Sequence, residues 1–154
     1  MGDRDLPMMM GAGCVLALLA PLGAGPAEGD QLRATIDRPA VLTAPARAPE
    51  SAAADQSAQG QRVVVYVTGF QPANEGSVQA VVKAQKPDGT EQEIGRFGIF
   101  PQAEFKSDQS GAQRYSFPLP KELAGGPVKL EVDLVPTRGK GEGAHLEVGR
   151  AEIQ

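Results

Sequence analysis

The segment "VKLEVDLVP" (Val128 to Pro136) constrains the fold of this chain more than any other part of the sequence. Its apolar residues, Val128, Leu130, Val132 and Leu134, alternate with single polar ones. This period of two is typical of a β-strand that buries one face, whereas a helix repeats its apolar residues every three or four positions. We therefore predict a strand that packs one face against a hydrophobic core.

Segments of the same kind recur along the chain, separated by turn-forming residues. The turn "KPDG" predicts a hairpin, because proline presets φ and glycine accepts a positive φ. One helical turn is expected within "PKELAGG" (residues 120–126). About seven strands with turns at this spacing predict a single all-β domain, an antiparallel β-sandwich or barrel. The predicted strands cover residues 32–36, 62–70, 77–85, 91–100, 113–119, 128–136 and 145–154.

The last of these strands contains an irregularity. Leu146 and Val148 share one face, but Ala151 and Ile153 are out of phase with them. An extra residue in the strand corrects the phase, so we predict a β-bulge at residues 149–150.

The segment "LRATIDRPA" (Leu32 to Ala40) predicts a short strand that ends at Pro39, because proline cannot donate to a ladder. Residues 44–61, which follow, are rich in Ala, Pro, Ser and Gln and have no aromatic or large aliphatic side chain. Such a segment buries too little surface to offset the entropy of ordering, so we predict a flexible insertion at 44–61. The strand before it is then an edge of the fold, and the insertion crosses the outside of the domain.

Residues 1–27 form a signal-like segment that differs from the rest of the chain. "MMMGAGCVLALLAPLGAGPA" is apolar, is interrupted by Gly and Pro, and ends in small residues. This pattern predicts a signal peptide cleaved after Ala27 or Ala24, and hence an exported domain at 28–154, periplasmic or extracellular, without a stable membrane span. The start "MGDRDLP" lacks the usual net positive charge, because Arg4 stands between Asp3 and Asp5. This leaves an uncleaved anchor or a misplaced start codon as alternatives. A lipoprotein attached through Cys14 is less favoured. A lipobox follows the apolar region of a signal peptide, whereas only three apolar residues precede the small residues before Cys14.

The composition argues against several function classes. The net charge is −4 and the basic residues are scattered, which argues against a nucleic-acid-binding protein. One cysteine and one histidine, His145, provide neither an internal disulfide nor a metal site with several such ligands. Ser107 and Ser116 lack the elbow of a catalytic nucleophile, and the carboxylates of Glu91 and Glu93 are expected to be solvated surface charges. We predict no catalytic residue, no metal and no cofactor, and therefore a protein that is not an enzyme.

The few aromatic residues provide the candidate binding residues. Phe97 and Phe117 lie inside predicted strands and are expected in the core. Phe70 and Phe100 fall at strand ends, beside a glycine and a proline. Each of these two is either a cap over the core or an anchor presented to a partner protein. We therefore take Phe70 and Phe100 as candidate partner-binding residues.

The order of several segments resembles the C-terminal, KFDV-type domain of plant-type polyphenol oxidases and tyrosinases. These segments are "ATIDRP", "VVVYVTGF", "IGRFGIFPQ", "VKLEVDLVPTRG" and "LEVGRAEI", and the resemblance covers Leu32 to Ile153. Where the family has its Lys-Phe-Asp-Val run, this chain has "VQAVVKAQ". The dicopper domain with its six histidine ligands is absent from the sequence, so the resemblance does not imply oxidase activity.

In that family the sandwich packs over the copper domain and shields its entrance. The resemblance therefore implies a non-catalytic exported module that shields or assists a separate tyrosinase-like copper oxidase. The alternative is a structural or general protein-interaction β-sandwich of the cell envelope, unrelated to copper. A third hypothesis, an enzyme that uses surface carboxylates, requires a cleft containing carboxylates with shifted pKa values.

Overall fold

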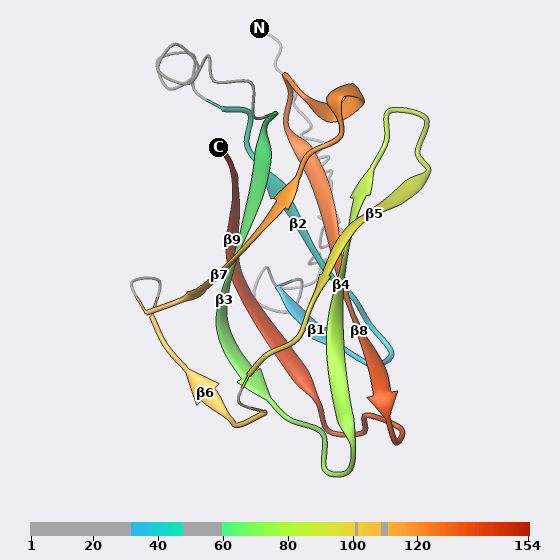
Figure 1. Cartoon of the computed structure of the whole chain (residues 1–154), viewed down its shortest axis with the longest axis vertical. Helices are drawn as coiled ribbons and strands as arrows, with labels where there is room; N and C mark the ends of the chain where they lie inside the picture. The colour runs from blue at the N-terminus through green and yellow to red at the C-terminus, as the bar shows by residue number, and fades with distance from the viewer. Residues whose placement is uncertain (1–31, 48–59, 101, 109–110) are drawn as a thin grey trace, which may run out of the picture.

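The structure is a computed structural model that describes residues 32–47, 60–100, 102–108 and 111–154. Two antiparallel sheets pack face to face in it, with β3 and β9 on the left of Figure 1 and β4 and β8 on the right. The predicted antiparallel β-sandwich is confirmed. The predicted signal peptide at 1–27 and most of the predicted insertion at 44–61 lie outside the described residues.

The first sheet has the strand order β1-β9-β3-β6, and β7 also pairs with β3. The short strand β1 is an edge strand that pairs with β9, as predicted. The bounds of these strands are Arg33–Thr35 for β1, Arg62–Gln71 for β3, Phe105–Lys106 for β6, Gln113–Pro118 for β7 and His145–Ile153 for β9.

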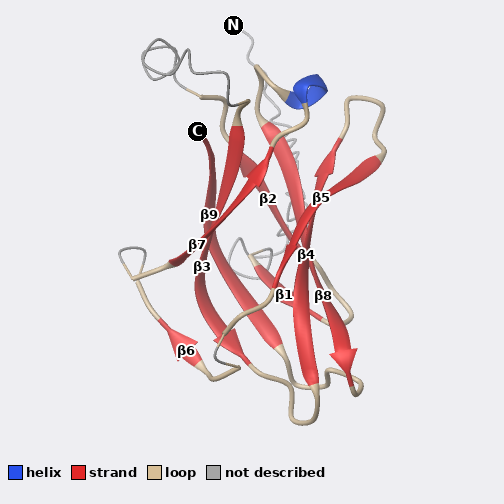
Figure 2. Ribbon diagram, viewed as in Figure 1, coloured by secondary structure: helices blue, strands red, loops and turns tan. Residues whose placement is uncertain are grey.

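The second sheet has the strand order β2-β8-β4-β5. The predicted hairpin joins β4 to β5, where the Lys86 N–H donates to the Thr90 carbonyl and Gly89 has a φ of 84°. The one helical element among the described residues is the 3₁₀ turn η1, Lys121–Leu123, which lies in the segment where a helical turn was predicted (Figure 2). The strands are Ala40–Ala44 for β2, Ser77–Gln85 for β4, Glu91–Phe97 for β5 and Val128–Arg138 for β8.

Two strands were not predicted from the sequence, β2 and β6. β2 pairs with β8 over its whole length, and its residues Ala40, Leu42 and Ala44 are buried. Ala44 therefore belongs to a strand and not to the insertion, whose predicted start was one residue too early. Alanine has a weak preference for strands, so this alternation did not stand out from the Ala-rich residues that follow.

The core lies between the two sheets, as the alternating pattern predicted. Val128, Leu130, Val132 and Leu134 of β8 are all buried and point toward the first sheet. The predicted bulge in β9 is also confirmed, because Arg150 pairs with Tyr66 while Val148 pairs with the next residue of β3, which leaves Gly149 as the extra residue. The bulge allows all four apolar residues of β9 to be buried, Leu146, Val148, Ala151 and Ile153.

The two flanks of the sandwich differ. On one flank, which we call the closed flank, Phe97 of β5 stacks on Tyr115 of β7 with ring centroids 3.9 Å apart, and Phe117 lies 6.0 Å from Phe97. These rings fill the space between the edges of the two sheets, and Phe97 and Phe117 are buried as predicted. On the other flank, the open flank, a groove separates β2 from β9.

Candidate functional site

Phe70, one of the two candidate partner-binding residues, belongs to the core. Its side chain is 2% exposed, and it pairs with Phe105 of β6 on one side and Leu146 of β9 on the other. The structure therefore gives Phe70 the first of the two roles considered for it, that of a cap over the core. Its ring is not presented to a partner.

Phe100, the other candidate, is 90% exposed. The loop that carries it is fixed on both sides of the ring. The preceding residue, Ile99, is buried, and the Gln102 side-chain amide donates to the carbonyl oxygens of Ile99 and Val78, both at 3.2 Å. Phe100 is thus held outward by an anchored loop.

Val135 is the other large hydrophobic residue that is exposed among the described residues, at 37%. It lies on the outer face of β8, opposite Gln79 of β4. Phe100 and Val135 are the large hydrophobic side chains exposed on the described surface. This surface therefore has isolated exposed apolar side chains and not a broad apolar patch.

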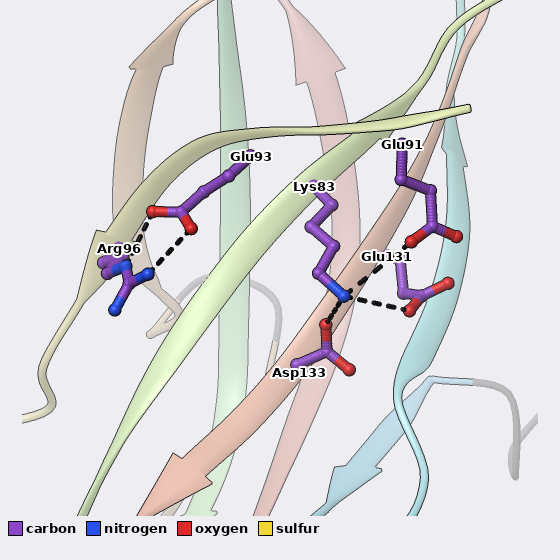
Figure 3. Close-up of polar contacts among 6 residues, drawn as sticks. All are labelled: Lys83, Glu91, Glu93, Arg96, Glu131 and Asp133. Carbon is purple, nitrogen blue, oxygen red and sulfur yellow. Dashed lines mark hydrogen bonds and ion pairs between the residues drawn. The ribbon is translucent and has the colours of Figure 1, made fainter. Parts of the chain in front are cut away.

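A cluster of charged residues covers the outer face of the second sheet (Figure 3). The Lys83 ammonium of β4 lies 2.7 Å from an oxygen of Asp133, 3.7 Å from one of Glu131 and 3.7 Å from one of Glu91. Asp133 and Glu131 are on β8 and Glu91 is on β5, so strand register brings three carboxylates to one lysine. We call these four residues the Lys83 cluster.

The pKa shifts in the Lys83 cluster indicate a structural ion pair. The hydrogen bond to Asp133 raises the pKa of Lys83, which keeps the amine protonated. Burial, with a hydrogen bond to Glu91, raises the pKa of Glu131. A lysine that acts as a base or nucleophile needs a lowered pKa, so the arrangement holds Lys83 as a cation and not as a reactive amine.

Glu91 and Glu93, the carboxylate pair considered in the sequence, face two different cations. Glu91 faces Lys83, whereas Glu93 accepts hydrogen bonds of 2.6 and 2.9 Å from the Arg96 guanidinium. The hydrogen bond from Arg96 lowers the pKa of Glu93. Both carboxylates are thus surface charges engaged with cations.

His145 and Ser116 are separated by the length of β3. His145 pairs with Gln71 at one end of the strand, while Ser116 pairs with Val64 near the other end. The Ser116 hydroxyl accepts a hydrogen bond of 2.7 Å from Arg62. Within the described ranges, no three His, Cys, Asp or Glu side chains are grouped so that they could hold a metal ion. No helix in the part of the chain that the structure describes is long and apolar enough to span a bilayer.

Sequence reasoning missed the Lys83 cluster and the open flank. Lys83, Glu131 and Asp133 each occupy a polar position of an alternating strand, which is a visible signal. Which of these positions meet depends on the register between strands, and that register is not contained in the alternation itself.

No protein-family model matches the chain, and no curated protein matches it. The resemblance to the polyphenol oxidase C-terminal domain therefore stays a prediction from the sequence.

Proposed function

We propose that this chain is a non-catalytic β-sandwich that binds another protein, with Phe100 as its principal contact. The observation that carries the proposal is the exposure of this ring on an anchored loop. Burying a phenylalanine side chain contributes about 1.5 to 3 kcal/mol. A loop that is already ordered loses little conformational entropy on binding. An exposed, preorganised aromatic residue is therefore well suited to anchor a protein interface.

The charged residues support a role without catalysis. The Lys83 cluster pairs its lysine with three carboxylates on the outer face of a sheet, and Glu93 is paired with Arg96. The contacts of the Lys83 cluster join three neighbouring strands, so they serve the sheet itself. In this proposal the two sheets are a scaffold, and the loop after β5 carries the function.

A finer proposal names the partner and the location. Phe100 lies within "IGRFGIFPQ", one of the segments that carry the resemblance to the polyphenol oxidase domain. This coincidence favours an exported module that shields or assists a separate tyrosinase-like copper oxidase. The coarser form of the proposal, a general protein-interaction sandwich of the cell envelope, needs no copper protein.

The test is a pull-down from the native host with three tagged chains, the wild type, Phe100→Ala and Val135→Ala. Val135→Ala is the matched control, because it also removes an exposed apolar side chain. We expect Phe100→Ala to reduce capture of the main partner at least about ten-fold and Val135→Ala to leave it nearly unchanged.

Captured proteins are identified by mass spectrometry and assayed for catechol oxidation. Recovery of a copper oxidase that depends on Phe100 supports the finer proposal, and recovery of another protein with the same dependence supports the coarser one. Equal capture by the wild type and Phe100→Ala contradicts both.

A further inference from the structure

Two arginines on the outer face of the first sheet have no carboxylate partner. Arg62 of β3 and Arg114 of β7 are exposed, and neither forms an ion pair with a residue that the structure describes. Three other arginines on the outer sheet faces are paired with carboxylates at 2.6, 2.6 and 2.8 Å, namely Arg33 with Glu147, Arg96 with Glu93 and Arg150 with Glu152. In a chain with 19 acidic and 15 basic residues, Arg62 and Arg114 therefore form a local excess of positive charge.

The register between β3 and β7 brings these two arginines to neighbouring positions around Ser116. Arg114 and Ser116 are two residues apart on β7, so they share one face at a separation of about 7 Å. Arg62 reaches across from β3, where its Nε donates to the Ser116 hydroxyl oxygen at 2.7 Å and its Nη2 donates to the Ser116 carbonyl oxygen at 3.1 Å. The Arg62 guanidinium thus lies at Ser116, next to the position of Arg114.

Neutral groups hold both guanidinium groups in place. Arg62 is fixed by its two hydrogen bonds to Ser116, and the Arg114 guanidinium lies 5.5 Å from the centroid of the Tyr66 ring, within the range of a cation–π interaction. Tyr66 is itself buried, and its hydroxyl donates to Glu152 at 2.9 Å. These contacts position the two arginines without neutralising their charges.

The cluster of Arg62, Arg114 and Ser116 presents hydrogen-bond donors to the solvent. Arg62 uses its Nε–H and one N–H of Nη2 on Ser116, which leaves the N–H groups of its outer edge. Arg114 donates no hydrogen bond to any residue in the described ranges. The Ser116 hydroxyl oxygen accepts from Arg62, so its hydrogen can be donated outward. A ligand that matches this cluster is an anion with several acceptor oxygens.

From these observations we infer that Arg62, Arg114 and Ser116 bind a tetrahedral oxyanion, a phosphate or sulfate group. Two guanidinium groups match the charge of a doubly charged oxyanion, and each planar fork can donate to two oxygens. A carboxylate has two oxygens, so one fork satisfies it and the second arginine stays unpaired. The group is either a free ion or the phosphate of a lipid headgroup. Phe100 is not part of this site, so the inference goes beyond the proposed function and does not depend on it.

The test uses the full chain labelled with ¹⁵N, titrated with inorganic phosphate at about pH 8 and constant ionic strength. We expect saturable shifts of the amide resonances of Arg62, Arg114 and Ser116 and of the Arg62 Nε–H resonance. Sulfate should cause the same shifts. Acetate, a planar oxyanion with one charge, should bind at least about ten-fold more weakly.

Four variants locate the site. Arg62→Gln and Arg114→Gln should each weaken phosphate binding at least about five-fold. Arg62→Lys keeps the charge but loses the planar fork, and it should weaken binding about three-fold. Arg96→Gln makes the same change of net charge as the first two, but Arg96 is paired with Glu93, so binding should not change. All three arginines are exposed, so these variants should fold like the wild type.

Vesicles distinguish the two sources of the phosphate group. The chain is sedimented with phosphatidylcholine vesicles that either contain or lack phosphatidic acid. The net charge of the chain is −4, so an anionic vesicle repels it unless a local site binds the headgroup. Co-sedimentation that requires phosphatidic acid and is lost in Arg62→Gln and Arg114→Gln supports a lipid headgroup as the ligand. Binding of inorganic phosphate without co-sedimentation supports a free ion.

Several results would overturn the inference. They are equal affinity for phosphate and acetate, shifts that do not saturate, and unchanged phosphate binding in both Arg62→Gln and Arg114→Gln. An equal loss of binding in Arg96→Gln and Arg62→Gln would also overturn it, because the net charge and not the site would then determine binding.

Discussion

Gly95 of β5 illustrates how single residues determine the packing of the closed flank. A Cβ atom at this position would overlap the ring of Phe117, which is buried beside Phe97. We therefore expect Gly95→Ala to lower the free energy of unfolding by about 1 to 3 kcal/mol, the usual cost of an overpacked core. Urea denaturation followed by circular dichroism measures the change.

Gly98 provides the matched control for this substitution. It lies just after β5, and a Cβ built there meets no atom within 4 Å. Gly98→Ala should change the free energy of unfolding by less than about 0.5 kcal/mol. Similar losses in the two variants would mean that the backbone, and not the contact with Phe117, determines the cost.

At the level of the strands, the Lys83 cluster couples β4, β5 and β8. The pKa of Lys83 is raised, so its stabilising contribution is present below the ordinary pKa of lysine and is lost as the pH rises above it. Lys83→Met should lower the free energy of unfolding at pH 7 by about 1 kcal/mol, because three carboxylates then face one another without a cation. The loss should shrink as the pH falls toward 4, because the pKa of Glu131 is raised and this carboxylate then gains a proton.

The measurement is urea denaturation at several pH values between 4 and 8, with Lys129→Met as the control. Lys129 also lies on the outer face of β8, but it forms no ion pair with the residues that the structure describes. A loss in Lys83→Met that does not vary with pH would show that packing of the lysine stem, and not charge, is responsible.

Most strands could be predicted because their alternating pattern records which face is buried, as in β8. β2 and β6 could not, for different reasons. β2 buries two alanines, which resemble linker residues, whereas β6 has two residues and is defined by its pairing with β3. The sequence identified both candidate phenylalanines but not which of them is exposed, because exposure depends on neighbouring strands. Phe70 and Phe100 look alike as strand ends, but Phe70 lies in β3 between β6 and β9 and is buried, whereas Phe100 follows the end of β5 and is exposed.

Considered as a whole, the molecule is asymmetric about its core. One flank is filled by the rings of Phe97, Tyr115 and Phe117, and the other has a groove between β2 and β9. Figure 1 shows β6 at the margin of the first sheet, well away from the second. This arrangement predicts that parts of the molecule open independently while the centre unfolds as a unit.

Native-state hydrogen exchange measures this difference. Val65 lies in β3 between β7 and β9 and is fully buried, so its amide should exchange only when the whole sandwich unfolds. The Ser107 N–H donates to the Thr68 carbonyl at 2.8 Å, yet it directly follows the two-residue strand β6. Its exchange should require only local opening, with a free energy at least about 2 kcal/mol lower and little dependence on urea. If both amides gave the same free energy and the same dependence on urea, β6 would be part of the cooperative core, and the loop between β5 and β7 that carries Phe100 would be as stable as the sheets that support it.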